Sequence, residues 1–254
     1  LAINDDLTGA AEITLSGVGD VSTPKIGITG TVDIGHTSTG SVTLNGTAYN
    51  IDGDTTITTT SAADKIAIGD ALTIKTAGDK VEFVGGGITL NDDGHDLTIT
   101  AGAGNVTLTD IGGHSSEVID IEGATVTAAV IGNADEIKSV KLDGSTKVVL
   151  GGNITTSNTT LNKVEIVGDA QLSANVTINT SANNGLIDFS GKIDSDSNTK
   201  HTLTLTSGAG NIAVDDAIGS TKAIGALKIN DGVTGTGTIA LTGIGESSTP
   251  AAGV

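Results

Sequence analysis

The sequence predicts an all-β protein that folds as a solenoid. Short apolar alternations such as LTIT, VTLT, VEIV and LTLT are each followed by Gly, Asn, Asp or Ser, which is typical of strands and turns. The chain has 37 glycines but only one tyrosine and two phenylalanines, so we expect a narrow aliphatic core. The phrase HDLTITAGAGNVTL at 95–108 also recurs as HTLTLTSGAGNIAV at 201–214, which indicates a repeat.

Apolar pairs between the two copies of this phrase predict the length of one coil. Five intervals of about 16 to 24 residues span the 106-residue offset, and their mean is about 21 residues. The pairs are Leu97/Ile99, Ile119/Ile121, Val140/Leu142, Val164/Ile166, Ile187/Phe189 and Leu203/Leu205. We therefore expect Ile121, Leu142 and Ile166 to lie in the core.

The repeated phrase is interpreted as the same corner of the coil, met twice. Gly102/Gly104 and Gly208/Gly210 would form that corner, because glycine permits the positive φ of a sharp turn. Asn105 and Asn211 would form hydrogen bonds along the stack just before each strand restarts. The alternative is a pair of tandem β-sandwich domains about 106 residues apart, each with many short strands.

Two regions are predicted along the chain. Residues 1–40 follow the repeat less closely and are expected to be an N-terminal strand or assembly segment, and residues 41–254 form the solenoid body. Both the start (LAINDDLTGAAEITLSGVG) and the end (GTGTIALTGIGESSTPAAGV) contain strand-like alternation without a capping helix. We expect these ends to pair with other copies of the chain, giving a homopolymer.

Charge limits the partners. The chain has 12 lysines, no arginine and 30 acidic residues, and its net charge of −18 would repel nucleic acid and anionic lipid. No apolar run approaches the roughly 18 residues of a membrane span. The absence of cysteine excludes disulfides and thiolate metal sites. A start at Leu1 without methionine fits a secreted mature chain, or a fragment of a longer one.

Phrases such as GAGNIAVDDAIGSTKAIGALKIND give the chain a family resemblance. Over about Asp64 to Gly245 the sequence resembles bacterial extracellular β-helix proteins: filamentous-haemagglutinin-like adhesins, autotransporter passenger domains and S-layer-like proteins. The resemblance implies a right-handed parallel β-helix at the cell surface, serving as a stalk, a coat or an adhesive surface for a glycan or a host. It carries over no catalytic residue.

The common catalytic motifs are missing. The sequence has no Gly-x-Ser-x-Gly elbow, zinc-binding His-Glu-x-x-His, phosphate loop or Gly-x-Gly-x-x-Gly fingerprint. The enzymatic alternative is a polysaccharide-processing β-helix, which could draw on the many carboxylates. A chain without arginine and with few aromatic platforms for sugars favours a non-enzymatic protein.

Acidic clusters suggest a cofactor, because Ca²⁺ binds several carboxylate and carbonyl oxygens. The candidate ligands are Asp92, Asp93, Asp96, Asp194, Asp196 and Asn198. The segment from Asp194 begins like an EF-hand loop but has Thr199 where glycine belongs and Leu205 where the bidentate Glu belongs. The alternative interpretation is that these acids are solvated turn residues.

A further alternative concerns threonine. Thr-x-Thr pairs could stack into a flat hydroxyl array of the kind found on ice-binding solenoids, although Thr is also an ordinary strand residue. They are Thr98/Thr100, Thr107/Thr109, Thr125/Thr127 and Thr202/Thr204/Thr206. The favoured interpretation remains an extracellular, self-assembling structural protein that forms a filament or a surface layer and has a possible adhesive role.

Overall fold

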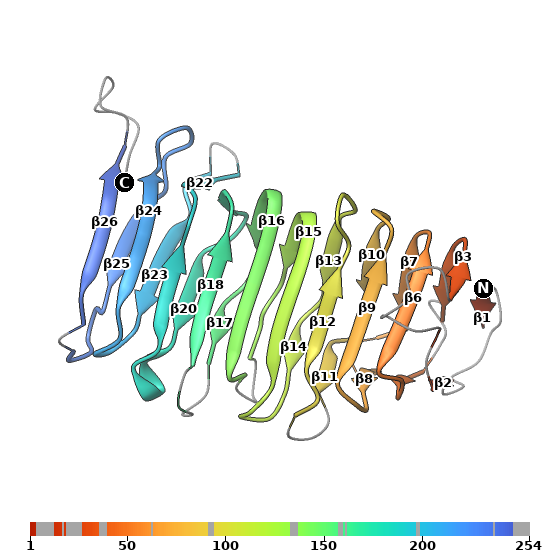
Figure 1. The fold of residues 1–254 in the computed structure, drawn as a ribbon. Coiled ribbons are helices and arrows are strands. Elements are labelled where there is room, and N and C mark those ends of the chain that lie inside the picture. The colour runs from red at the N-terminus through yellow and green to blue at the C-terminus, as the bar shows by residue number, and fades with distance from the viewer. Residues whose placement is uncertain are drawn as a thin grey trace.

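The computed structural model describes residues 1–3, 13–16, 18, 27–35, 40–61, 63–90, 94–132, 137–156, 160, 162–196, 199–235 and 237–245. In these residues the chain forms a parallel β-solenoid of about 8 turns with about 24 residues per turn (Figure 1). Its strand pairs are parallel, and its one helical element among the described residues is the 3₁₀ turn η1 (Ser181–Asn183). The predicted solenoid is confirmed, and tandem sandwiches are wrong because antiparallel pairs are absent from this part of the chain.

The strand pairings divide the solenoid into three long faces. On the first face, strands follow one another side by side along the molecule, from the N-terminal end at the right of Figure 1 to the C-terminal end at the left. Its strands are β3 (Ile28–Thr29), β6 (Ala48–Asp52), β9 (Leu72–Thr76), β12 (Leu97–Thr100), β18 (Lys163–Val167), β21 (Leu186–Phe189) and the first parts of β15 (Val118–Ala128), β16 (Ser139–Leu150), β24 (Ile212–Ile218) and β26 (Ile239–Ile244).

The second face follows the first within each coil. It contains β1 (Ala2–Ile3), β4 (Val32–Ile34), β7 (Thr55–Thr58), β10 (Val81–Val84), β13 (Val106–Leu108), β19 (Ala170–Leu172), β22 (Ile193–Ser195) and the last parts of β15, β16, β24 and β26. Because these four long strands bend around the corner, the first and second faces form one 17-stranded sheet.

The third face closes the coil. It contains β2 (Ile13–Leu15), β5 (Val42–Leu44), β8 (Ile66–Ile68), β11 (Ile88–Leu90), β14 (Ile111–Gly112), β17 (Ile154–Thr155), β20 (Val176–Asn179), β23 (Thr202–Thr206) and β25 (Ala226–Ile229). Ile131 bridges β14 and β17, so the five-stranded and four-stranded sheets of this face form one continuous stack.

Alternation along each strand builds the core. In β12, Leu97 and Ile99 are buried while Thr98 and Thr100 are half-exposed, as a period of two requires. The register places each inward residue on its counterpart in the next coil, giving the buried column Ile74, Ile99, Ile121, Leu142, Ile166, Phe189 and Val214. The three predicted core residues Ile121, Leu142 and Ile166 are therefore confirmed.

The core is one narrow hydrophobic cluster that runs from Ile13 to Ile224. The few aromatic side chains, Tyr49, Phe83 and Phe189, are all buried in it. The hydroxyl of Tyr49 donates a hydrogen bond to the carbonyl oxygen of Leu15, 3.0 Å away, so this buried polar atom is satisfied.

The coil is longer than the predicted 21 residues. The prediction was too short because it assumed that the repeated phrase returns to the same corner, and it does not. In the first copy Leu97 lies on the first face and Val106 on the second, whereas in the second copy Leu203 lies on the third face and Ile212 on the first. The 106-residue offset therefore spans five coils less one face. Treating the offset as five whole coils gave a predicted coil length of about 21 residues, whereas the coil in the structure has about 24.

The described strands within residues 1–40 pair with the solenoid body. Ile13 aligns with Val42 on the third face, and Val32 aligns with Thr55 on the second. These strands extend the same faces toward the N-terminal end. The boundary at residue 40 and the right-handed sense of the coil stay predictions.

Candidate functional site

The C-terminal coil exposes side chains whose counterparts in the preceding coil are buried. β26 aligns Ile239 with Ile212 and Ile244 with Ile218. Ile212 and Ile218 are at most 1% exposed, but Ile239 is 47% exposed and Ile244 is 52% exposed. In the described residues β26 pairs only with β24, and β25 only with β23. This end therefore presents an apolar strip beside strand edges, which is the usual template for adding another strand.

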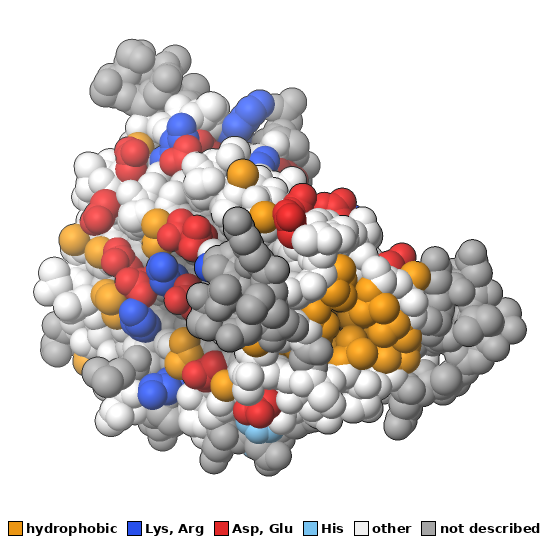
Figure 2. Space-filling model, turned by 45° about the vertical axis from the view of Figure 1, so that its right-hand side comes forward, with side chains coloured by type: hydrophobic (Ala, Val, Ile, Leu, Met, Phe, Trp, Pro, Cys, Tyr) orange, Lys and Arg blue, Asp and Glu red, His pale blue; other side chains and the backbone are white. Residues whose placement is uncertain are grey.

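The opposite end is also apolar. Figure 2 shows hydrophobic side chains gathered in one group at the N-terminal end of the solenoid. Here Leu1 is 50% exposed, and Ile3, Leu15, Val18 and Ile28 are only partly buried against the core. A contiguous apolar surface of this kind is a common mark of an interaction site.

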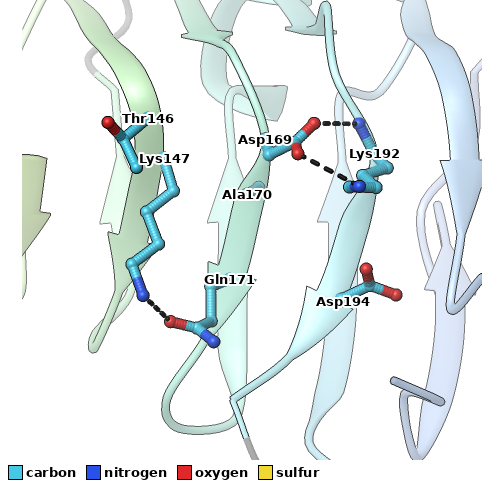
Figure 3. A pocket seen from close by; sticks show the side chains of 7 residues that line it. All are labelled: Thr146, Lys147, Asp169, Ala170, Gln171, Lys192 and Asp194. Atoms are coloured by element: carbon cyan, nitrogen blue, oxygen red, sulfur yellow. Dashed lines mark hydrogen bonds and ion pairs between the residues drawn. The ribbon is translucent and has the colours of Figure 1, made fainter. Parts of the chain in front are cut away.

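A polar hollow of about 150 Å³ lies on the second face (Figure 3). Three successive coils form it, through β16, β19 and β22. It is lined by Thr146, Lys147, Asp169, Ala170, Gln171, Lys192 and Asp194. The hollow is shallow because it is a depression between the side chains of stacked strands.

Ion pairs and hydrogen bonds hold the side chains of the hollow. Lys147 Nζ donates to Gln171 Oε1 at 2.7 Å, and Lys192 Nζ lies 3.3 Å from Asp169 Oδ2 (Figure 3). Asp194 Oδ1 accepts hydrogen bonds from the backbone N–H groups of Thr221 and Lys222, both at 3.0 Å. Two ammonium groups and two carboxylates leave the hollow close to neutral. It can hydrogen-bond a small hydroxyl-rich molecule.

The six predicted calcium ligands do not all fall within the described residues. Asp92, Asp93 and Asn198 lie outside them. Asp96 accepts a hydrogen bond from the backbone of Val118, Asp194 lines the polar hollow, and Asp196 Oδ1 lies 3.1 Å from His201 Nε2. The described residues contain no group of three His, Cys, Asp or Glu side chains placed to hold a metal ion. The calcium site stays a prediction.

Asp96 belongs to a recurring contact, which we call the Asx cap. An Asp or Asn immediately before the first inward residue of a strand uses Oδ1 to accept the backbone N–H at the equivalent position in the next coil. The distances run from 2.7 to 3.4 Å, and the residues are Asp54, Asp96, Asn105, Asp110, Asn153, Asp169, Asn175 and Asn211. The predicted roles of Asn105 and Asn211 are confirmed.

The Asx cap gives a structural role to one of the residues that the sequence suggested for calcium, Asp96. A carboxylate or amide oxygen satisfies a backbone donor where the chain turns a corner and strand pairing begins. The signal in the sequence is local: an Asx followed directly by an inward apolar residue, as in Asn105-Val106 or Asn153-Ile154. Such a pair is too short to be distinguished from an ordinary turn without the register.

The first face carries a dense ladder of charge. Outward positions align Asp120, Lys141, Glu165 and Asp188 on four successive coils, and Figure 2 shows acidic side chains interleaved with lysines. Lys141 Nζ lies 3.7 Å from Asp120 and 3.6 Å from Asp143, so it bridges two carboxylates. Partial burial, and then the charges of Asp215 and Glu165, raise the pKa of the Asp188 carboxyl, while Lys163 acts in the opposite direction.

The Thr-x-Thr pairs do not form one array. Thr98 and Thr100 lie on the first face, Thr107 and Thr127 align on the second, and Thr202, Thr204 and Thr206 lie on the third. The pairs at Thr98 and Thr107 lie on successive strands of one coil, so they cannot share a face. The premise of the ice-binding alternative, one flat stack of these pairs, is therefore wrong.

Comparison with known proteins gives no family. No family model matches the chain, and neither the curated proteins nor the solved structures yielded a similar protein. Within the described residues, no helix has the length and apolar character needed to cross a membrane.

Proposed function

We propose that the chain is a non-enzymatic structural subunit that assembles end to end into an extracellular filament or surface layer. The observation that carries this proposal is the exposure of Ile239 and Ile244, which occupy core positions in the last coil. Burial of two such isoleucines contributes favourable free energy on the order of 25 cal/mol per Å² of apolar area. A partner must therefore offer an apolar strand layer.

A second copy fits this requirement. Its N-terminal coil presents partly buried apolar residues on the same three faces, with Ile3 on the second, Leu15 on the third and Val18 at the start of the first. Stacking there would continue the parallel pairing already present between coils. Because the two ends are different surfaces, the contact is heterologous and does not close, so growth is one-dimensional.

The extracellular location rests on composition and on the β-helical character. Proteins without cysteine and with an acidic surface suit assemblies that remain soluble until they join at defined sites. Adhesion to a glycan or a host surface is a further role, for which the polar hollow is the candidate contact. The hollow offers both donors and acceptors for hydroxyl groups.

Electron microscopy and sedimentation test the assembly. The double variant Ile239→Asp/Ile244→Asp places charges in the end contact, and we expect the concentration needed for assembly to rise by about a hundredfold or more. The control is Ala240→Asp/Thr242→Asp, which adds the same charge to outward positions of the same strand. A wild-type chain that stays monomeric at high concentration, with or without Ca²⁺, contradicts the proposal.

The non-enzymatic assignment is supported by the engaged carboxylates of the hollow. Asp169 is paired with Lys192, and Asp194 accepts two backbone hydrogen bonds. General acid–base work needs a carboxyl that can exchange a proton with substrate. Incubation with acidic and neutral polysaccharides is expected to give no new reducing or unsaturated ends, and their appearance would establish the enzymatic alternative.

Calcium is proposed as a stabilising ion for the acidic turns that include Asp92, Asp93 and Asp96, or Asp194, Asp196 and Asn198. An ion that binds only the folded state raises the melting temperature of the protein. Melting curves in millimolar Ca²⁺ and in chelator should therefore separate. Coincident curves would leave these residues as caps and solvated turn acids.

A further inference from the structure

The sequence contains two Asn-Gly dipeptides, Asn45-Gly46 and Asn184-Gly185. In such a dipeptide the backbone nitrogen of glycine can attack the side-chain carbonyl carbon of asparagine, because glycine has no Cβ to obstruct the approach. Both dipeptides lie at corners that lead from the third face to the first. Asn45-Gly46 stands between β5 and β6, and Asn184-Gly185 stands between η1 and β21. They are therefore a matched pair, with one dipeptide sequence in two settings.

The Asn184-Gly185 dipeptide is held by hydrogen bonds at its reacting groups. Gly185 uses its N–H, the group that would attack, to donate to the carbonyl oxygen of Thr180 at 2.9 Å. The side-chain Oδ1 of Asn184 accepts the N–H of Ala209 in the next coil at 2.7 Å. Thr180 also donates its hydroxyl to the carbonyl oxygen of Gly185 at 2.7 Å. Attack on Asn184 would have to break the first two of these bonds.

The Asn45-Gly46 dipeptide lacks such restraints in the part of the chain that the structure describes. Asn45 is exposed, and neither its side-chain amide nor the N–H of Gly46 forms a hydrogen bond with a described residue. Its Oδ1 lies against Gly69 of the next coil, where a Cβ would be only 2.0 Å away. That contact involves no hydrogen bond. The attacking nitrogen and the carbon it would attack are therefore not held apart as they are at Asn184.

We propose that Asn45 is a site of spontaneous deamidation in the folded protein. The backbone nitrogen of Gly46 bonds to Cγ of Asn45, its proton is transferred to Nδ2, and Nδ2 leaves as ammonia. The product is a cyclic succinimide. Water then adds to one of the two carbonyl carbons and opens the ring to aspartate or isoaspartate. The net reaction exchanges an amide and water for a carboxylate and ammonium, so it adds negative charge and needs no oxidant or other reactant.

Modification at this corner reaches the N-terminal strand β2. The carbonyl oxygen of Leu15 accepts two hydrogen bonds from the corner, from the N–H of Asn45 at 2.7 Å and from the hydroxyl of Tyr49 at 3.0 Å. Isoaspartate adds a methylene to the main chain between these two donors, so they no longer fit the same acceptor and β2 loosens. Weaker end-to-end contact follows, a consequence that rests on the proposed function, because the N-terminal coil is one side of that contact.

Mass spectrometry of peptides from the incubated protein tests the proposal. The folded wild-type chain is kept in neutral buffer, and the deamidated fractions of Asn45 and Asn184 are followed with time. An isoaspartate-specific methyltransferase identifies the rearranged product. The same measurement in urea is the matched control, because unfolding removes the hydrogen bonds that hold Asn184. The variant Asn45→Gln keeps an amide at this position, but its longer side chain cannot form the succinimide.

We expect Asn45 to deamidate about tenfold faster or more than Asn184 in the folded protein, because two hydrogen bonds must break at Asn184. In urea the two rates should agree within about threefold. Equal rates in the folded protein, or a faster reaction at Asn184, overturn the proposal.

Assembly is measured separately on fresh and incubated protein. Incubation should weaken assembly of the wild type and leave that of Asn45→Gln unchanged, and equal weakening of both would show that the link to the N-terminal coil is wrong. A fresh wild-type chain that forms no filaments contradicts the proposed function alone, since the two deamidation rates are also measurable on the monomer.

Discussion

Residues 95–108 and 201–214 share a phrase but occupy different places in the solenoid. Their local geometry is the same: Gly102 has φ of 55° and Gly208 has φ of 61°, and the N–H of Gly104 donates to Ala101 at 2.9 Å as that of Gly210 donates to Ser207 at 3.0 Å. Yet the first copy turns from the first face to the second, and the second copy turns from the third face to the first.

The comparison shows that neighbouring residues determine the conformation of a corner. They do not determine which face of the solenoid the adjoining strand joins. The phrase encodes a strand, a left-handed glycine, a tight turn and an Asx cap, and all of these depend on a few neighbouring residues. Which face the strand joins depends on the summed lengths of the segments before it. The same corner unit can therefore be used at any corner of a three-sided coil.

The largest effect is expected when a charge is placed in the core at matched positions of the two copies. It tests whether the two copies of the corner unit are structurally equivalent. Ile99→Asp and Leu205→Asp each bury an unpaired carboxylate, since both residues are at most 1% exposed. We expect each to lower the free energy of unfolding by roughly 4 kcal/mol or more. Urea denaturation followed by circular dichroism measures the change.

The matched controls for the core charges are Thr100→Asp and Thr206→Asp, one residue further along the same strands and pointing outward. They should change stability by less than about 1 kcal/mol. If Leu205→Asp were tolerated while Ile99→Asp was not, the third face would not share the core that joins the two copies.

The turns give the next largest effect. A Cβ at Gly104 would lie 2.0 Å from the carbonyl oxygen of Asp79, and one at Gly210 would lie 2.2 Å from that of Gly185. Both obstacles are backbone atoms of the preceding coil, so Gly104→Ala and Gly210→Ala should each destabilise by about 2 to 3 kcal/mol. Chemical denaturation of both variants tests whether the two corners are equally tight.

Gly102→Ala serves as the comparison for these turn variants, because a Cβ there would meet nothing closer than 3.9 Å. Its cost is the left-handed backbone alone, about 1 kcal/mol. A smaller loss at Gly104 than at Gly102 would show that coil-to-coil contact does not limit the corner.

The sequence predicted local features well and long-range ones less well. Strands such as Leu97–Thr100, the core positions Ile121, Leu142 and Ile166, and the caps at Asn105 and Asn211 follow from alternation and from the preference of Asx for turns. The assignment of Leu203 and Leu205 to the column of Ile187 and Phe189 was wrong. Coils that vary from 20 residues between Val106 and Val126 to 31 between Ala2 and Asp33 carry no fixed period from which to count faces.

The candidate sites were the least predictable part. The exposed Ile239 and Ile244 look like any other strand residues in the sequence, and only the register identifies them as core positions that no described coil covers. Acidic residues such as Asp96 attracted attention as metal ligands, although this carboxylate receives a backbone N–H from the next coil.

A smaller effect is expected from the caps. Asn105 Oδ1 accepts the N–H of Thr125 at 3.1 Å, and Asn211 Oδ1 accepts that of Thr238 at 2.9 Å. Asn105→Ala and Asn211→Ala should each cost about 1 kcal/mol, since a backbone donor loses its partner. Asn→Asp at either position keeps the acceptor oxygen and should recover most of the loss in a thermal melt. Equal losses for Ala and Asp would mean that the hydrogen bond contributes little.

The smallest effect comes from a position at which the copies differ. The first copy is followed by Thr109, and the second has Asp215 at the equivalent place. Burial and then the charge of Asp215 raise the pKa of Asp188, so the folded state favours the protonated form of Asp188. The contribution of Asp188 to stability is thus greatest below the ordinary pKa of Asp, about 3.9, and declines as pH rises through the raised pKa. Asp215→Thr removes one repulsion and should raise stability at pH 7 by less than about 1 kcal/mol, because both groups are partly solvated. The gain should disappear near pH 3, where Asp188 is protonated in both folded and unfolded chains. Melting temperatures of wild type and variant across this range test the sign, and a gain independent of pH would assign the effect to the strand preference of threonine.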